Sequence, residues 1–179
     1  MQVQTILHFW FEELTNKQHF TKDTALDEAI RARFGATLDA AARCELFAWR
    51  ATPDGALAEI IVLDQFSRNI YRDSSRAFAQ DALALALAQE LVARGQDSAL
   101  STEQRRFAYM PYMHSESPLI HTQAVLLFAQ QGLEDGLSFE LRHKTIIDRF
   151  GRFPHRNALL GRASSAEEIA FLNEPGSSF

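Results

Sequence analysis

The stretch Thr52-Pro-Asp-Gly-Ala-Leu-Ala-Glu-Ile-Ile-Val-Leu-Asp-Gln-Phe66 decides the fold of this 179-residue chain. Thr52 is a good N-cap residue and Pro53 suits the first helical position, so the pair predicts the start of a helix. From there to about Phe66 the sequence is apolar almost all round the helix. A helix with apolar side chains on most faces is buried on most sides, so we expect the rest of the chain to pack around it.

Helical signals continue on both sides of this central segment. Apolar residues at three- and four-residue spacing predict a helix over residues 3–14. Ser101 and Gln104 form a capping box for a helix that must kink or break at Pro111 in its interior. Cap and stop residues predict the other helices, over about 25–34 (ended by Gly35), 37–49, 75–93, 118–132, 138–150 and 166–172.

Almost nothing in the chain alternates with period two, so a sheet is not expected. Short connections between consecutive helices make antiparallel neighbours. A chain of this length builds one good core and is too short for two ordinary domains. We therefore predict a single all-α domain over residues 1–179, with about seven to nine helices stacked as antiparallel hairpins and residues 172–179 as a C-terminal tail.

The composition excludes several classes of protein. The net charge of −5 leaves no continuous basic stripe, which argues against nucleic-acid binding and against binding to an anionic membrane. No apolar run is long enough to span a bilayer and the N-terminal residues do not resemble a signal peptide, so we expect a cytoplasmic location. No phosphate-loop or dinucleotide fingerprint is present, so no cofactor is expected. Cys44, the single cysteine, lies on an apolar stripe and is expected to be a core thiol.

The first candidate cluster ends the central helix, at Asp64-Gln-Phe-Ser-Arg-Asn-Ile-Tyr-Arg72. Asp64 falls on an apolar stripe, where a carboxylate must be paired because an unpaired buried charge is very costly. Arg68, four residues later, is its nearest candidate partner. Either the two form a structural ion pair that fixes helix packing, or the segment faces a pocket. In the second interpretation the ligand-binding residues here are Arg68, Asn69, Tyr71 and Arg72.

The second cluster is Tyr109-Met-Pro-Tyr-Met-His-Ser-Glu116, where the proline can bend the backbone and open a cavity that Tyr112 would line. His114 is either a neutral, hydrogen-bonded core residue or a general base with Glu116 as its carboxylate partner. With His121 the cluster reads His-x-Glu-x4-His. That is not the i, i+4 histidine spacing of helical zinc sites, so no metal site is expected.

The third cluster is Phe150-Gly-Arg-Phe-Pro-His-Arg-Asn157, with its continuation Leu160-Gly-Arg-Ala-Ser-Ser165. Forked guanidinium donors beside an imidazole suit the recognition of a carboxylate or phosphate. The same donors can instead satisfy the carbonyl groups left free where two helices end. In the first interpretation His155 is a second candidate base, and the ligand-binding residues are Arg149, Arg152, Arg156 and Asn157.

Five motifs follow one another along the chain: Leu7-His-Phe-Trp-Phe, Leu63-Asp-Gln-Phe-Ser-Arg-Asn-Ile-Tyr-Arg, Arg76-Ala-Phe-Ala-Gln-Asp, Tyr109-Met-Pro-Tyr-Met-His-Ser-Glu and Arg149-Phe-Gly-Arg-Phe-Pro-His-Arg-Asn-Ala-Leu-Leu-Gly-Arg. Together they resemble a bacterial family, domain of unknown function 924. The resemblance spans nearly the whole chain and implies a tetratricopeptide-like helical fold, with no activity, cofactor or catalytic residue to transfer. One departure is Ser67, where the family more usually has proline. We therefore expect a less sharply defined helix end after Asp64.

Two functions from different classes fit these residues. The first is a binding module, in which an Arg- and His-lined concave pocket holds a small anionic molecule or a peptide carboxylate. The alternative is a small hydrolase or transferase acting on an anionic substrate. Its acid–base residue would be His114 or His155, oriented by Asp64 or Glu116. A structural or interaction scaffold is the third possibility, and the sequence does not decide the oligomeric state.

Overall fold

The computed structural model describes residues 2–178, and helices make up all of the regular structure among them. Met1 and Phe179, the outermost residues of the predicted domain and its tail, lie outside the described residues. The α-helices are α1 (Val3–His8), α2 (Asn16–Phe20), α3 (Thr24–Ala42), α4 (Pro53–Ile61), α5 (Ser67–Ile70), α6 (Asp81–Ala93), α7 (Thr102–Met113), α8 (Pro118–Phe128), α9 (Glu134–Phe150) and α10 (Ala166–Leu172). The π-helical segments are η1 (Phe9–Glu13) and η3 (Val62–Phe66), and the 3-10 segments are η2 (Phe47–Ala51), η4 (Ser75–Phe78), η5 (Gln96–Ala99) and η6 (Pro154–Arg156).

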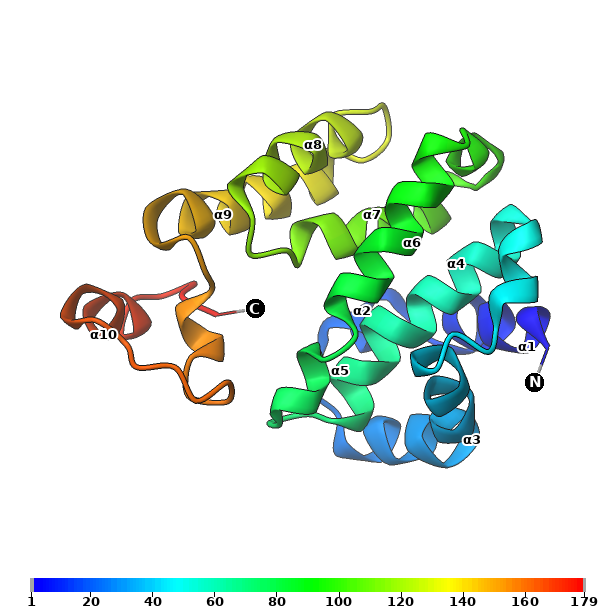
Figure 1. The fold of residues 1–179 in the computed structure, drawn as a ribbon, viewed down its shortest axis with the longest axis horizontal. Coiled ribbons are helices and arrows are strands. Elements are labelled where there is room, and N and C mark those ends of the chain that lie inside the picture. The colour runs from blue at the N-terminus through cyan, green and yellow to red at the C-terminus, as the bar shows by residue number, and fades with distance from the viewer. Residues whose placement is uncertain (1, 179) are drawn as a thin grey trace.

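The predicted all-α fold is confirmed. Because η3 joins α4 to α5 in one continuous helix, the ten α-helical segments of residues 2–178 form nine separate helices. Consecutive helices pack on each other, α6 on α7, α7 on α8 and α8 on α9 (Figure 1). His121 of α8 contacts Glu140 of α9, whereas Phe128, later in α8, lies against Gly136, earlier in α9, so this pair is antiparallel. The tetratricopeptide-like relationship stays a prediction.

The continuous helix from Pro53 to Ile70 forms the centre of the core. It begins as expected, since Thr52 Oγ1 accepts a hydrogen bond from the Gly55 N–H at 3.1 Å and the proline stands in the first turn. At Gly55 the chain passes so close to Trp49 that an added Cβ would lie 2.0 Å from the Trp49 carbonyl oxygen, so only glycine fits. The apolar residues of this helix are fully inaccessible: Leu57, Ala58, Ile60, Ile61, Val62, Leu63 and Phe66.

The π-helical turn η3 places polar side chains inside this core. Such a turn inserts one extra residue into an α-helix and is frequent at functional sites. All five of its residues are buried, Asp64 and Gln65 among them. Ser67, at the position where the family more usually has proline, is also fully buried and lies within the continuing helix. The helix therefore ends at Ile70 rather than beside Asp64.

Two local predictions are wrong, and one of two alternatives is excluded for a third. The helix α3 runs through Gly35, because Phe34 and Leu38 on either side are buried in the same core and an interior glycine costs only about 1 kcal/mol. Cys44 is exposed, with a φ of 58° just beyond the end of α3, so it is not a core thiol. At Pro111 a kink or a break was expected, and the break does not occur: α7 continues to Met113, and the whole segment around the proline is buried.

The connection between α8 and α9 also differs from its prediction. The helix α8 ends at Phe128 instead of Gly132, and α9 begins at Glu134 instead of Ser138. Gly132 has a φ of 86° and Leu133 is buried beside it, so the turn is tight and the second helix starts early.

The C-terminal part of the chain packs through a second, smaller apolar cluster. Ile146, Ile147 and Phe153 are buried in it, and Phe150 and Phe171 pack against them. Ser165 and Glu168 form the predicted capping box at the start of α10. This helix lies at one end of the molecule, and the chain after it turns back toward the middle (Figure 1). None of the helices in residues 2–178 combines the length and the apolarity needed to cross a membrane.

Candidate functional site

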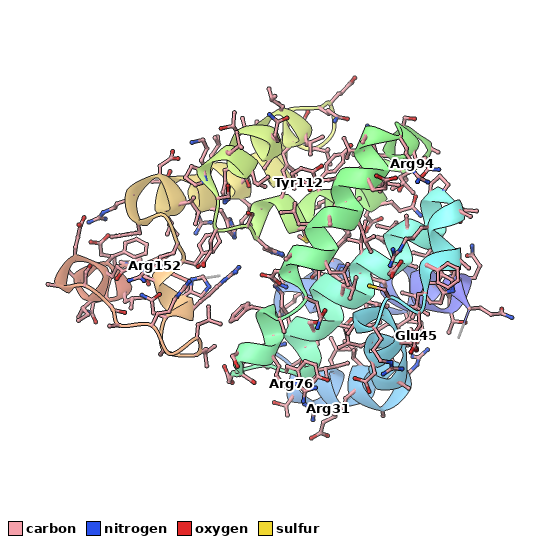
Figure 2. The ribbon with its side chains drawn as sticks, in the orientation of Figure 1. Arg31, Glu45, Arg76, Arg94, Tyr112 and Arg152 are labelled. Atoms are coloured by element: carbon pink, nitrogen blue, oxygen red, sulfur yellow. The ribbon has the colours of Figure 1, made fainter. Side chains whose placement is uncertain are left out.

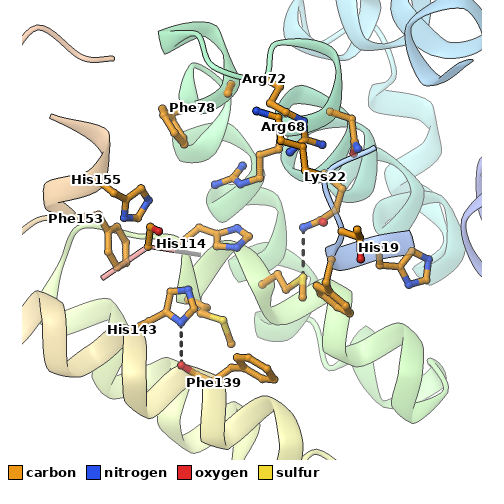
Figure 3. A pocket seen from close by; sticks show the side chains of 18 of the residues that line it. His19, Lys22, Arg68, Arg72, Phe78, His114, Phe139, His143, Phe153 and His155 are labelled. Carbon is orange, nitrogen blue, oxygen red and sulfur yellow. Dashed lines mark hydrogen bonds between the residues drawn. The ribbon is translucent and has the colours of Figure 1, made fainter. Parts of the chain in front are cut away.

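A cavity of about 790 Å³ opens between the C-terminal part of the chain and the helices α2, α5 and α7 (Figure 3). Small-molecule sites in proteins typically have volumes in this range. Its apolar wall consists of aromatic and methionine side chains, mainly Phe20, Phe78, Met110, Met113, Phe128, Phe139 and Phe153. Its polar wall consists chiefly of cationic and imidazole side chains, Lys22, Arg68, Arg72, Arg106, Arg156, His19, His114, His143 and His155, with Gln65, Asn69, Asp73 and Asp135.

The helix α7 lays one face along this cavity. Its capping box fixes where the helix begins, and Arg106, Met110 and Met113 then recur at three- and four-residue spacing on the cavity side. The guanidinium of Arg106 lies 4.9 Å from the centre of the Phe20 ring. None of the ion pairs formed within residues 2–178 involves Arg106, so its charge has no carboxylate partner there. His114 follows directly at the other end of the helix.

Two arginines and two aspartates form a charged network at the floor of the cavity. Arg68 Nη1 lies 3.0 Å from Asp64 Oδ1. The same guanidinium donates two hydrogen bonds to the Asp81 carboxylate, at 2.9 and 3.0 Å. Arg156 Nη1 donates to Asp81 Oδ2 at 3.1 Å. Within the described chain, Asp81 is the only carboxylate partner of Arg156, and Arg156 shares it with Arg68. Arg68 has a second carboxylate partner, Asp64.

Arg156 is held between two aromatic rings. Its guanidinium lies 4.6 Å from the ring centres of both Phe78 and Phe153, and the residue is only 6% exposed. Its Nε is buried and makes no hydrogen bond within residues 2–178. Burial lowers the pKa of Arg156 to about 10, and the neighbouring Arg68 adds to the effect. The guanidinium of Arg156 stays cationic at neutral pH. It has fewer carboxylate partners than Arg68, so its positive charge is less fully compensated.

Asp64 lies behind the cavity wall and holds His114 in one orientation. Its carboxylate is bound by Arg68, by Gln65 Nε2 at 2.5 Å and by His114 Nδ1 at 2.8 Å. Burial alone would raise the pKa of Asp64, but Arg68 and His114 outweigh it and hold that pKa well below its usual range. An ionised carboxylate only accepts hydrogen bonds, so the proton of this contact belongs to His114 Nδ1.

The imidazole of His114 is thereby fixed as one tautomer. Burial and Arg68 lower the pKa of His114 against the opposing pull of Asp64. The ring is then neutral near pH 7, and its proton is on Nδ1. The second nitrogen, Nε2, remains an unprotonated acceptor, and the His114 side chain is part of the cavity wall (Figure 3).

Two further histidines of the cavity wall are neutral as well. Burial lowers the pKa of His143 to about 3, and burial together with Arg156 lowers the pKa of His155 to about 4. The ring of His143 lies 6.4 Å from that of His114, and its Nδ1 is 2.8 Å from the Phe139 carbonyl oxygen. In the described chain, no three His, Cys, Asp or Glu side chains are grouped so as to hold a metal ion.

At the other side of the cavity, polar side chains are tied to α3. Arg72 donates to both oxygens of Asp27, at 2.5 and 2.7 Å, and Asn69 donates to Asp27 Oδ1 at 2.8 Å. Lys22 pairs with Asp73 at 2.8 Å, and its side chain is 63% exposed at the rim. These groups line the cavity but have most of their bonding capacity satisfied within the protein.

Comparisons with known proteins agree with this architecture. Residues 6–176 match a family described as bacterial protein of unknown function, DUF924. The chain belongs to this family. A solved structure of a protein of unknown function from Agrobacterium tumefaciens is similar to it, with a TM-score of 0.91 and 37% identity over 96% of each chain. A comparison with curated proteins found no match. The resemblance seen in the sequence motifs is confirmed.

The DUF924 chain brings some of the predicted site residues together. The cavity wall includes six of them. Two were catalytic candidates, His114 and His155. Four were ligand-binding candidates, Arg68, Asn69, Arg72 and Arg156. Asp64 stands directly behind His114. The predicted pairing of Asp64 with Arg68 is present, as a link in the network that includes Asp81.

Six other candidates lie away from the cavity. Glu116 is not a partner of His114, because its carboxylate accepts from the Phe153 N–H at 2.7 Å and from Arg162 at 2.5 and 2.9 Å. Arg152 donates to both oxygens of Glu168, at 2.7 and 2.8 Å, beside α10 (Figure 2). Much of the third cluster therefore fastens the C-terminal part of the DUF924 fold to itself.

The remaining four are satisfied by local contacts. Arg149 pairs with Glu167 at 2.9 Å on the surface. Asn157 is buried between Ser164 and Arg162, with hydrogen bonds of 3.0 Å to each. The Tyr71 hydroxyl accepts from Arg76 at 2.6 Å, and Tyr112 is buried among the helices, where burial raises its pKa to about 12 (Figure 2). None of these side chains is part of the site that we propose.

The sequence-based site missed several residues of the cavity wall, above all Arg106 and His19. The register set by the capping box at Ser101 was a usable signal for the first, because it places Arg106 on the same helix face as Met110 and Met113. His19 gave no such signal. Its Nε2 is 2.8 Å from the Trp10 carbonyl oxygen, a contact between segments that only the fold brings together.

Proposed function

We propose that the protein binds a small organic anion in this cavity. Arginine side chains hold the acidic group of the ligand, and its apolar body lies against the phenylalanine and methionine side chains. The observation that carries the proposal is the convergence of Arg68, Arg106 and Arg156, from three separate parts of the chain, on one space of about 790 Å³.

The charge balance of the wall supports an anionic ligand. Arg106 has no carboxylate partner among the described residues, and Arg156 shares Asp81 with Arg68. A half-buried cation with incomplete compensation is stabilised when an anion reaches it, and a guanidinium forms strong, charge-assisted hydrogen bonds to carboxylates. Arg106 is therefore the best candidate for the residue that binds the acidic group.

The test uses a bicyclic aromatic carboxylate, 6-hydroxy-2-naphthoate, against its neutral amide, 6-hydroxy-2-naphthamide, in isothermal titration calorimetry. We expect the carboxylate to bind and Arg106→Met to weaken that binding about 10- to 100-fold, the worth of one hydrogen bond to a charged group. The matched control is Arg94→Met, which removes an exposed arginine paired with Glu90. Equal binding of acid and amide, or equal effects of the two substitutions, would contradict the proposal.

The carboxyl terminus of a peptide offers the same chemistry as a free carboxylate. Isothermal titration calorimetry with a tripeptide ending in phenylalanine, compared with its C-terminal amide, tests whether the ligand is a peptide carboxyl terminus. Binding of the tripeptide acid but not of the naphthoate would make the protein a peptide-binding module. Retention of neither acid would favour the scaffold interpretation.

A further inference from the structure

The proposed ligand site contains a histidine, His114, of which only one ring nitrogen is hydrogen-bonded within the described residues. His114 Nδ1 hydrogen-bonds to Asp64, and its Nε2 makes no hydrogen bond within residues 2–178. His121 provides an internal comparison, because both of its nitrogens are used, by Glu140 at 2.7 Å and by the Ser115 carbonyl oxygen at 2.8 Å. His121 is fully buried, whereas the side chain of His114 is 15% exposed at the cavity.

The surroundings of His114 are those of a general base. Asp64, 1% exposed, orients the ring from behind, and the same carboxylate oxygen binds Arg68 at 3.0 Å. The charged and titratable groups that face the ring come from every element around it: Asp64 and Arg68 from the central helix, Asp81 from α6, His143 from α9, and His155 and Arg156 from η6. In such an arrangement the carboxylate can orient the base and the imidazole can accept a proton. The adjacent guanidinium groups can stabilise a developing anion.

We propose that the protein hydrolyses an ester carried by the bound organic anion, with His114 Nε2 as the general base that activates water. The inference rests on the proposed binding function, since Arg106 must hold the acidic group of the substrate. Arg106 of α7 and His114, the residue directly after that helix, are eight residues apart, or about 12 Å along the helix axis. The substrate is therefore an elongated molecule with a carboxylate at one end and an ester at the other.

The reaction balances as an ordinary ester hydrolysis. Within the described chain no serine, threonine or cysteine hydrogen-bonds to His114, so the attacking oxygen comes from water. The water oxygen bonds to the ester carbonyl carbon while one of its protons passes to His114 Nε2. Negative charge develops on the carbonyl oxygen, beside Arg68 and Arg156. The bond to the alcohol oxygen then breaks, that oxygen takes the proton back from Nε2, and the products are a carboxylic acid and an alcohol.

Asp64 acts as a positioning residue in this sequence. It keeps the Nδ1 proton in place and stabilises the imidazolium that forms when Nε2 accepts a proton. Burial and Arg68 lower the pKa of His114, so Nε2 remains available as a base at neutral pH. We expect turnover to be constant near pH 7 and to decline below the ordinary histidine pKa of 6.5, as the ring becomes protonated.

The test uses 6-acetoxy-2-naphthoate, which releases fluorescent 6-hydroxy-2-naphthoate on hydrolysis. The decisive variant is His114→Asn, whose amide nitrogen can replace Nδ1 as a donor to Asp64 while the base is lost. We expect turnover to fall about 100-fold or more, the usual contribution of a general base. Affinity for the product should change less than twofold. The matched control, His8→Asn, replaces a histidine whose side chain is 58% exposed and should leave turnover unchanged.

The outcomes separate the two proposals. If the wild-type protein binds the naphthoate product but cleaves the ester no faster than the His114→Asn protein, hydrolysis is wrong and binding stands. If the product itself does not bind, the binding function fails first. His114→Gln serves as the second variant, with circular dichroism as the check on folding. Full activity in either folded variant would overturn the role of His114.

Discussion

Asp64 Oδ1 and His114 Nδ1 are 2.8 Å apart, and their hydrogen bond joins the centre of the hydrophobic core to the wall of the cavity. The two residues are separated by 50 positions in the chain. Asp64 belongs to the π-helical turn of the central helix, and His114 follows the last turn of α7. The orientation of the candidate base therefore depends on how these two helices pack.

Asp64→Asn should destabilise the fold and disturb His114 together. Removing one charge from a buried, paired network typically costs about 3 kcal/mol in the free energy of unfolding. The matched control is Asp39→Asn, which replaces an exposed aspartate on α3 and should change that free energy by less than about 0.5 kcal/mol. Urea denaturation at pH 7 measures both. Similar values for the two variants would show that the buried carboxylate is not stabilising.

Stability should fall as the pH is lowered from 6.5 to 4.5. His143 and His155 have folded-state pKa values of about 3 and about 4, below the ordinary value of 6.5. In that range the unfolded chain binds protons that the folded protein does not, so each histidine removes up to about 1.4 kcal/mol of stability per pH unit. The low pKa of Asp64 reduces the free energy of unfolding only at lower pH, where the aspartates of the unfolded chain become protonated.

Substitution of the two histidines tests this assignment. The double variant His143→Gln, His155→Gln should show a flatter dependence of unfolding free energy on pH between 6.5 and 4.5. The control His8→Gln replaces a solvent-exposed histidine and should keep the wild-type slope. Parallel curves for all three proteins would mean that other groups cause the acid sensitivity.

Arg152 and Arg156 are four residues apart and should respond differently to replacement. Arg152 fastens Glu168 at the start of α10, where its hydrogen bonds lower the pKa of Glu168 to about 2. Arg152→Ala should lower the melting temperature by about 2–4 °C and leave the affinity for 6-hydroxy-2-naphthoate within twofold. Arg156→Met should weaken that affinity at least tenfold. The reverse pattern would place the anion site beside Arg152 and Glu168 of α10 instead of in the cavity.

Two glycines offer a matched test of the packing. Gly55→Ala should destabilise the fold by several kcal/mol, because the new Cβ would lie 2.0 Å from the Trp49 carbonyl oxygen and the backbone must move. Gly35→Ala places a methyl group where nothing lies within 4 Å, in the interior of a helix, and should stabilise by about 0.5–1 kcal/mol. Thermal denaturation compares the two. A stable Gly55→Ala protein would contradict the close approach.

Local signals predicted much of the fold. Thr52 with Pro53, and the capping boxes at Ser101 and Ser165, mark helix starts through contacts within a few residues, so the sequence alone is sufficient to place them. Gly35 failed as a stop signal because core packing on both sides outweighs the local preference of glycine. The exposure of Cys44 was missed because the apolar stripe ends where α3 ends.

The site was less predictable, since its partners are distant in sequence. Asp64 was correctly expected to need a partner, yet the sequence offered only Arg68 nearby and could not indicate Asp81 or His114. Glu116 looked like the partner of His114 because it is two residues away, but it binds Arg162 across the fold. The cytoplasmic location and the single-domain organisation also stay predictions.

The helix from Pro53 to Ile70 contributes fully buried residues to the core and also carries side chains of the cavity wall. Backbone amides in such an element exchange with solvent only when the whole molecule opens. A ligand present at a hundred times its Kd raises the free energy of that global opening by about 2.7 kcal/mol. Deuterium uptake at Leu57, which does not line the cavity, would then slow about a hundredfold. The protein can thus report its physiological ligand from within a mixture of metabolites, without an assay for what it does to that ligand.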